Sequence, residues 1–287
     1  MPARDARGAR VVEVAELESV AHGYLDDAGA ASIARWHALS GYSLELTQYT
    51  GGRITITTGT RSLVEAIADE APFERRLSTP VAAVRHTGGR VEVETRAGEL
   101  LPARAVVVAA PLNALPGIAF EPGLSELKQA GIALGQASRG NKIVIRARRE
   151  AISQNAIRRG HPFGYLDTEI LEDGGTQVMI GFGRDAAVCD ATDLAWVQRE
   201  LDAILPGYEA LDASAHDWLA DEFARGTWAI HRPGWYATYH RELQRPEGRV
   251  VLGGSDLADG WAGFMDGAIE SGIRVGRQAA ALAVHAP

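Results

Sequence analysis

The sequence has little of what several common kinds of site require. Cys189 is the single cysteine among 287 residues, which excludes an internal disulfide and a zinc site built from several cysteines. We interpret it as a small buried side chain rather than a nucleophile, because free cysteines usually behave as core residues. No hydrophobic run approaches the roughly 20 residues that a membrane-spanning helix needs.

Basic side chains are also in the minority. The chain has 29 Lys and Arg against 37 Asp and Glu, a net charge of -8, and its basic residues are scattered rather than gathered in a stripe. A nucleic-acid partner is therefore not expected, because such binding rests on basic patches. The basic residues 1–10 are not followed by the apolar core of a signal peptide, so we predict a cytoplasmic protein with no membrane partner.

Histidines with metal-ligand spacing, such as H-E-x-x-H, are absent as well. We interpret the histidines below as surface or loop residues. They are His86, His161, His216, His231 and His240.

What is present is an ordinary globular composition, with 46% hydrophobic and 23% charged residues. Helical and strand patterns are mixed without strict alternation, which predicts an α+β fold on a mixed sheet, with the last strand and helix in a second layer. Helices are expected at residues 11–40 (broken at Gly29), 62–71, 193–205 and 262–284, with a short one after Pro122. Strands are expected at residues 53–57, 81–86, 91–95, 105–110, 142–147, 177–183 and 249–252.

The segment from Gly253 to Gly272, GGSDLADGWAGFMDGAIESG, is the most informative. A buried strand ends in small residues, Asp256 lies in the turn, and a glycine-rich helix follows. Small residues there allow a flat ligand or another backbone to approach closely. The helix N-terminus, with its unpaired N–H groups, suits an electron-rich carbonyl. On spacing alone, tight helix packing is an equally good interpretation.

This segment resembles the FAD-contacting C-terminal motif of the flavin monoamine oxidase family, which has a G-T-E turn and a W-S-G-Y-M-E-G-A-x-x-S-G helix. The matching residues are Trp261, Gly263, Met265, Gly267, Ala268, Ser271 and Gly272. Ser255, Asp256 and Phe264 are close replacements. The resemblance implies that Asp256 contacts the ribityl and phosphate region and that the helix start faces the flavin. The cofactor-binding residues that it implies are Val81, Trp218, Gly254, Ser255, Asp256, Trp261, Ala262, Gly263 and Met265.

A second stretch, residues 218–234, resembles the part of monoamine oxidases that carries the covalent flavin cysteine. Thr227 stands at the cysteine position, and a hydroxyl cannot form that thioether, so the resemblance implies a non-covalently held FAD. Trp228 and Phe264 then take the places of the two walls of the family's aromatic cage, which orients the amine. Without the resemblance, both would be interpreted as core aromatics.

Lys142 lies between apolar residues of an expected strand, where a lysine is either an edge charge or a buried, functional ammonium. In the family, a lysine on the matching strand reaches flavin N5 through a water. The resemblance therefore implies a catalytic role for Lys142 beside Trp228 and Phe264. Two weaker matches, at Val81 and at residues 107–111, concern the adenine end of the cofactor.

The family's opening unit, G-x-G-x-x-G after an N-terminal strand, has no counterpart here. The resemblance covers about residues 51–283. It implies FAD-dependent oxidation of an amine, with hydride transfer from the α-carbon to flavin N5 and O2 as the acceptor. We expect the chain to be inactive without a second chain that supplies the dinucleotide-binding half, in a hetero-oligomer.

The resemblance also predicts a division of the chain. Residues 1–50 are expected to be the helical part of a substrate lobe, and residues 111–248 the rest of that lobe. Residues 51–110 and 249–287 are expected to belong to the FAD-binding layer.

Two alternatives to an amine oxidase are kept open. An amino acid oxidase or a related flavin desaturase has the same fold, and the former needs an arginine for the substrate carboxylate, for which Arg139, Arg158 and Arg232 are candidates. A non-catalytic remnant or binding subunit is favoured by the absent nucleotide-binding unit, and it is opposed by the retained Lys142 and Trp228.

Overall fold

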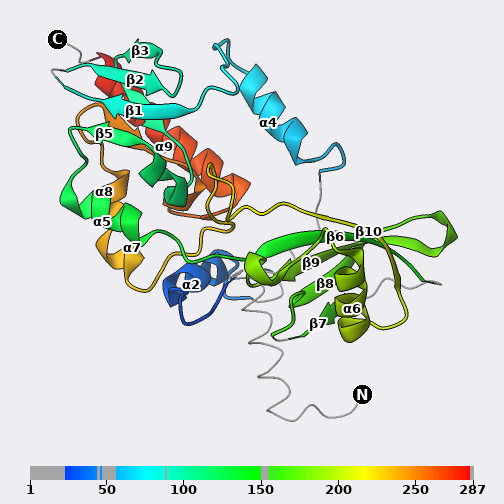
Figure 1. Cartoon of the computed structure of the whole chain (residues 1–287). Coiled ribbons are helices and arrows are strands. Elements are labelled where there is room, and N and C mark those ends of the chain that lie inside the picture. The colour runs from blue at the N-terminus through cyan, green and yellow to red at the C-terminus, as the bar shows by residue number, and fades with distance from the viewer. Residues whose placement is uncertain are drawn as a thin grey trace.

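The structure is a computed structural model that describes residues 23–43, 46, 56–87, 89–149, 155–158 and 160–284. Two lobes are visible in Figure 1, one built around helix α9 and one around the sheet that contains β6. The expected strand at residues 53–57 lies largely outside the described residues, as do residues 11–22 of the expected N-terminal helix.

The first lobe holds two small sheets. A four-stranded sheet has the order β3-β2-β1-β5, with β1 antiparallel to β2 and parallel to β5. Its strands are β1 Val81–Arg85, β2 Val91–Thr95, β3 Leu100–Ala103 and β5 Ala119–Glu121. The hairpin predicted between β1 and β2 is thus confirmed. The other sheet is a single parallel pair, β4 Val106–Val108 with β11 Val250–Leu252.

Helix α9, Met265–Val284, lies across this parallel pair (Figure 1). The valine-rich strands suit a parallel pair, because such strands are covered on both faces and favour β-branched residues. Gly253 permits the close approach, since a Cβ there would come within 2.9 Å of Val275. The helix starts three residues later than predicted because Gly263 is held at φ +85°, outside the helical region.

The second lobe is one antiparallel sheet with helix α6, Leu194–Ile204, on one face. The strand order is β10-β6-β9-β8-β7. The strands are β6 Asn141–Arg148, β7 Asn155–Ile157, β8 Tyr165–Leu171, β9 Thr176–Gly183 and β10 Glu209–Ala215. Sequence reasoning found β6, β9 and α6, but it missed β7, β8 and β10. The last two carry several polar residues and each has a register shift, which obscures the alternation.

Strand β6 alternates strictly between the two faces of this sheet. Ile143 and Ile145 are fully buried in the core shared with α6, whereas Lys142 and Val144 lie on the opposite, open face. The alternation of β6 therefore decides which of its side chains can meet a ligand.

Short helices and turns complete the structure, and most of them pack into the core of the first lobe. They are α2 Ala30–Leu39, α5 Glu126–Leu134, α7 Trp235–Thr238, α8 His240–Gln244 and the 3-10 turns η1 Leu112–Gly117 and η4 Ser255–Leu257. Helices combined with one mixed, one antiparallel and one parallel sheet are consistent with the predicted α+β class. No helix in the described ranges is both long and apolar enough to cross a membrane.

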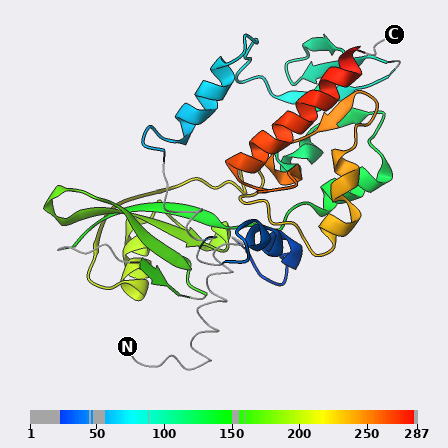
Figure 2. The ribbon, with the colours of Figure 1, turned by 180° about the vertical axis from the view of Figure 1, so that it is seen from behind.

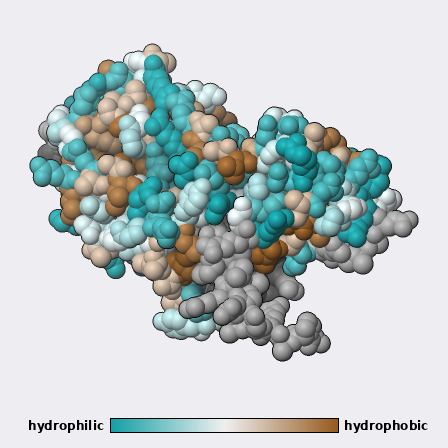
Figure 3. Space-filling view, turned by 60° about the horizontal axis from the view of Figure 1, so that its bottom comes forward, coloured by the Kyte–Doolittle hydropathy of each residue, from teal (hydrophilic) through white to brown (hydrophobic). Residues whose placement is uncertain are grey.

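Helix α4, Thr60–Asp69, stands apart from both lobes in two opposite views (Figures 1 and 2). None of its residues is buried, and Val64 is 62% exposed. On α9, the apolar residues Met265, Ile269 and Ile273 follow each other at four-residue spacing and are also exposed. We call this stripe the open face of α9. On the side seen in Figure 3, by contrast, hydrophobic and hydrophilic residues are interspersed over both lobes.

The two faces of β6 give a direct test of its register. Ile143→Ala should lower the free energy of unfolding by roughly 2–5 kcal/mol, because it leaves a cavity in the core. Val144→Ala, which changes the neighbouring residue on the open face, should cost less than about 1 kcal/mol. Urea unfolding curves would measure both, and equal losses would mean that the strand faces are assigned wrongly.

Candidate functional site

A cavity of about 380 Å³ opens where the two lobes meet, which is a size typical of small-molecule sites. Its wall comes from segments that are distant in sequence. It is lined by Pro111, Asn113, Gln136, Lys142, Phe182, Trp218, Ala224, Gly226, Thr227, Trp228, Ser255, Asp256 and Gly263. Six of the predicted site residues therefore share one cavity, namely Lys142, Trp218, Trp228, Ser255, Asp256 and Gly263.

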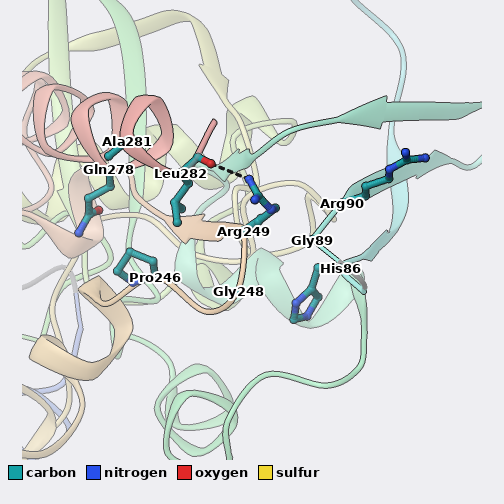
Figure 4. A pocket seen from close by; sticks show the side chains of 9 residues that line it. All are labelled: His86, Gly89, Arg90, Pro246, Gly248, Arg249, Gln278, Ala281 and Leu282. Atoms are coloured by element: carbon teal, nitrogen blue, oxygen red, sulfur yellow. Dashed lines mark hydrogen bonds between the residues drawn. The ribbon is translucent and has the colours of Figure 1, made fainter. Parts of the chain in front are cut away.

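A second cavity of about 460 Å³ lies at the far end of α9 (Figure 4). It contains none of the predicted site residues, and its cationic groups do not converge. Arg249 Nη1 donates to the carbonyl oxygens of Arg104 and Leu282, at 3.0 and 2.6 Å, while Arg90 points away from the other side chains. We therefore assign the candidate site to the smaller cavity.

The acidic turn after β11 forms one side of the candidate site. Gly254 makes the turn at φ +102°, where a Cβ would come within 3.3 Å of the Ala109 carbonyl oxygen. Asp256 Oδ2 accepts a hydrogen bond of 2.7 Å from the Leu112 amide, and Ser255 Oγ donates to Oδ1 at 3.3 Å. Burial raises the pKa of Asp256, because the hydrogen bonds do not fully replace water.

The start of α9 forms the adjacent side. Gly263 lines the cavity, and a Cβ there would come within 3.1 Å of the Ala229 amide nitrogen. The preceding turn is held from behind, since the Ala262 carbonyl accepts a 3.1 Å hydrogen bond from Trp36 Nε1. Met265, the first helical residue, is 46% exposed. The helix N-terminus is thus fixed next to the cavity without a bulky side chain at Gly263.

Lys142 reaches the cavity from the open face of the second lobe. Strand β6 lies between β10 and β9, but β10 ends opposite Ile143, so Lys142 is paired with β9 alone. Its side chain is exposed on the open face, so the expectation of a buried ammonium is not met. Phe182 is its cross-strand partner, and the ring centroid lies 5.4 Å from Lys142 Nζ, within cation–π range. The ammonium group therefore lies in the cavity wall, against an aromatic ring.

The two aromatic residues predicted to face each other across a substrate do not do so. The ring centroids of Trp228 and Phe264 lie 5.8 Å apart, which is a direct ring contact that leaves no room for a ligand between them. Phe264 packs edge-on against Trp36 and Trp261 at 5.3 and 5.5 Å and does not line the cavity. The reason is that Phe264 joins an aromatic cluster beside α2. Trp228 lines the cavity with Phe182 and Trp218 instead.

Two carboxamides in the cavity wall were missed by sequence reasoning. Asn113 Oδ1 accepts from the Gln136 amide at 2.9 Å, and its Nδ2 donates to the Arg225 carbonyl at 2.9 Å. Gly226 fits against them only without a side chain, because a Cβ would lie 2.0 Å from Gln136 Nε2. The one sequence signal for Asn113 was its position just after an apolar strand. Phe182, a third residue of the cavity wall that was missed, had no such signal, because its place depends on the register between β6 and β9.

Other predicted residues lie elsewhere. Val81 begins β1, away from the cavity. The three arginines considered for a substrate carboxylate do not line it either. Arg139 pairs with Asp185, Arg158 donates to the Ala203 carbonyl, and Arg232 donates to the Leu134 carbonyl.

The interpretation of the five histidines as surface or loop residues is wrong for His240, which is 3% exposed and lies in helix α8. His161 and His231 lie in connecting segments, as expected, but they are buried, at 7% and 0% exposed. The His231 ring stacks on Trp235 with centroids 3.8 Å apart, and burial lowers its pKa to about 3. Within the described residues, no group of His, Cys, Asp or Glu is suited to hold a metal ion.

Cys189 was interpreted as a small buried side chain rather than a nucleophile, and it is partly buried. Burial raises the pKa of its thiol to about 11, so the nucleophilic thiolate is disfavoured.

Comparison with known proteins places these features in context. A family model described as "Flavin containing amine oxidoreductase" matches residues 13–280. A pseudooxynicotine dehydrogenase of Pseudomonas sp is 37% identical, over 92% of this chain and 54% of its own length. An (S)-6-hydroxynicotine oxidase of Paenarthrobacter nicotinovorans is 32% identical, over 75% of this chain and 50% of its own length. The chain thus spans about half the length of the curated relatives that it matches.

Among solved structures, putrescine oxidase bound to putrescine superimposes with a TM-score of 0.73 at 15% identity. The match covers 98% of this chain and 77% of that one. At this identity, the likeness concerns the fold alone.

The buried His231 predicts a loss of stability in acid. Its pKa is about 3 in the folded protein and 6.5 when unperturbed, so below pH 6.5 the unfolded chain binds a proton that the folded chain does not. The free energy of unfolding should therefore fall between about pH 6.5 and pH 3, by up to about 1.4 kcal/mol per pH unit for this one proton. His231→Phe, which keeps a ring on Trp235, should make the fall shallower, whereas the exposed control His216→Phe should not. Urea unfolding at a series of pH values would measure this, and identical slopes for both variants would contradict it.

Proposed function

The chain belongs to the flavin-containing amine oxidoreductase family, and we propose that it forms the substrate-binding half of an FAD-dependent enzyme that oxidises an amine. The observation that carries the proposal is that one cavity gathers Lys142, Trp228 and Asp256 from three separate elements. The lobe built on β6 to β10 would bind substrate, and the lobe with β11 and α9 would belong to the FAD-binding layer.

FAD is the cofactor that the family implies, and the cavity fits the flavin end of that molecule. A flat heteroaromatic ring needs aromatic or apolar walls and close backbone approach, which Trp228, Phe182 and Gly263 offer. Asp256 and the start of α9 provide the few polar groups that orient such a ring. The hydroxyl of Thr227 in the cavity wall supports a non-covalent attachment.

When bound, FAD supplies the redox chemistry by accepting a hydride from the amine α-carbon and passing the electrons to an acceptor, for which we propose O2. The chain's own residues position the amine and select its uncharged form. The Lys142 ammonium disfavours a second cation nearby, so the amine should bind uncharged. Lys142 also offers hydrogen-bond donors that can hold an ordered water in the cavity. Trp228 orients the substrate through its ring face.

We further propose a substrate that carries an aromatic ring beside its amine. Three aromatic side chains, Phe182, Trp218 and Trp228, line the cavity, and two of the similar relatives are named for pseudooxynicotine and 6-hydroxynicotine. An amino acid substrate is less well supported, because none of the three candidate arginines lines the cavity.

The dinucleotide-binding half should come from polypeptide outside these 287 residues. That a separate chain supplies it stays our prediction. The support is the apolar surface that nothing in the described residues covers, namely helix α4, the open face of α9 and Val107 of β4, together with a parallel sheet of two strands alone. Parallel strands are normally covered on both faces and continued by neighbours. A polypeptide that extends this sheet and covers α9 would complete the layer.

Lys142→Met should slow flavin reduction or reoxidation in the assembled enzyme by at least about tenfold, because it removes the ammonium and the water it holds. Arg146→Met changes a cation on the same open face of β6, farther along the strand, and should leave both rates near wild type. Stopped-flow absorbance of the bound flavin would follow each half-reaction with an aromatic amine and then with oxygen. Normal turnover of the Lys142 variant would show that the cavity position of Lys142 serves no catalytic purpose.

Purified alone, the 287-residue chain should be colourless and self-associating, and it should turn yellow only with the dinucleotide-binding half. Ile273→Asp on the open face of α9 should block this assembly. Leu171→Asp, at an equally exposed site on the other lobe, should not block it. Size-exclusion chromatography with visible absorbance would decide. A stable, yellow, monomeric chain that oxidises amines would refute the need for a second half, and a colourless assembly would refute the FAD function itself.

A further inference from the structure

Ser138 is a buried residue that touches two residues of the cavity wall without lining the cavity itself. It is 2% exposed and lies just before β6. Its Oγ forms a short hydrogen bond with Thr227 Oγ1 and accepts one of 3.3 Å from the Trp228 amide. Thr227 and Trp228 line the cavity. One hydroxyl therefore holds both residues from behind.

The segment that carries Ser138 is itself firmly held. Gln136 Oε1 accepts a 2.7 Å hydrogen bond from the Ser138 amide, so a side chain of the cavity wall fixes the Ser138 backbone. The Ala137 amide donates to the Ile230 carbonyl at 2.6 Å, and Gln136 pairs with His231 in an antiparallel bridge. Residues 136–138 thus run alongside residues 227–231 as a short, braced pair.

From this geometry we infer that Ser138 is a positioning residue, which fixes the direction of the Thr227 hydroxyl and the seat of Trp228 for a flavin in the cavity. The inference rests on the proposed function, because it assigns a ligand to that cavity. Thr227 is the contact residue, and Ser138 acts through it.

The physical reason lies in the hydrogen-bonding capacity of two hydroxyls. Each has one proton to donate and two lone pairs to accept with. If Ser138 donates to Thr227, the Thr227 proton is directed elsewhere and can reach the ligand. If Thr227 donates, its oxygen can accept from the ligand. In either case the hydrogen bond to Ser138 fixes the rotation of the Thr227 hydroxyl, and loss of the Ser138 hydroxyl leaves that rotation free of this contact.

A double-mutant cycle tests the inference in the protein that contains both halves. Ser138→Ala should raise the FAD dissociation constant about tenfold, as expected for one lost hydrogen bond, and Thr227→Val should do the same. The double variant should bind less weakly than the product of the two single effects, because much of the Ser138 effect passes through Thr227. The absorption band of the bound flavin should shift equally in all three. If Ser138→Ala folds poorly, Ser138→Cys, which keeps nearly the same volume, replaces it. The same tenfold rise in the FAD dissociation constant is expected for it.

Ser32→Ala is the matched control. Ser32 is also 2% exposed, and its Oγ accepts a 3.0 Å hydrogen bond from the His231 amide on the same segment, but it does not touch Thr227. It should leave the FAD dissociation constant unchanged. Independent, multiplicative effects of the Ser138 and Thr227 variants would overturn the inference. An equal loss in the Ser32 variant would also overturn it, because it would indicate general loosening.

Amide hydrogen exchange separates a failure of this inference from a failure of the proposed function. If the wild-type assembly binds no flavin, the proposed function is wrong. The Trp228 amide should still exchange faster in Ser138→Ala than in wild type or Ser32→Ala, by roughly tenfold. An unchanged exchange rate would overturn the positioning role without reference to any cofactor.

Discussion

The hydrogen bond from the Leu112 amide to the Asp256 carboxylate joins the two places where the parallel strands β4 and β11 end. Most of the cavity wall depends on that junction. Leu112 is followed by Asn113, whose side chain holds Gln136, and Gln136 in turn fixes Ser138 beside Thr227 and Trp228. Hydrogen bonds, linked by the backbone between Leu112 and Asn113, thus connect the acidic turn of one lobe with the aromatic wall near the other.

The polar groups in this series lie in a poorly solvated setting, where each hydrogen bond matters more than at the surface. Asp256 shows this most clearly, because burial raises its pKa even though it accepts two hydrogen bonds. The Asp256 carboxylate can accept a further hydrogen bond from a donor in the cavity. The cavity wall therefore keeps acceptor capacity for a ligand.

Local patterns in the sequence were enough to predict the hairpin of β1 and β2, the strands β6 and β9, and the glycine-rich turn before α9. The resemblance to the flavin monoamine oxidase family, carried by motifs that are contiguous in the chain, implied six residues of the cavity wall. Phe182 and Gln136 were missed because their places are set by pairing between distant segments. Phe264 shows the opposite case. Its motif marks the right turn, but the neighbouring Trp36 and Trp261 draw its ring into an aromatic cluster.

The pairing of β4 with β11 also has a consequence for how the molecule forms. All the strands of the second lobe lie between these two partners in the chain, so they belong to an insertion within the first lobe. Contacts of such high sequence separation form slowly, whereas the antiparallel sheet of β6 to β10 is comparatively local. During synthesis the inserted lobe can fold on its own, whereas β4 stays unpaired until β11 has left the ribosome. The cavity, which needs both lobes, is then the last part of the chain to take shape.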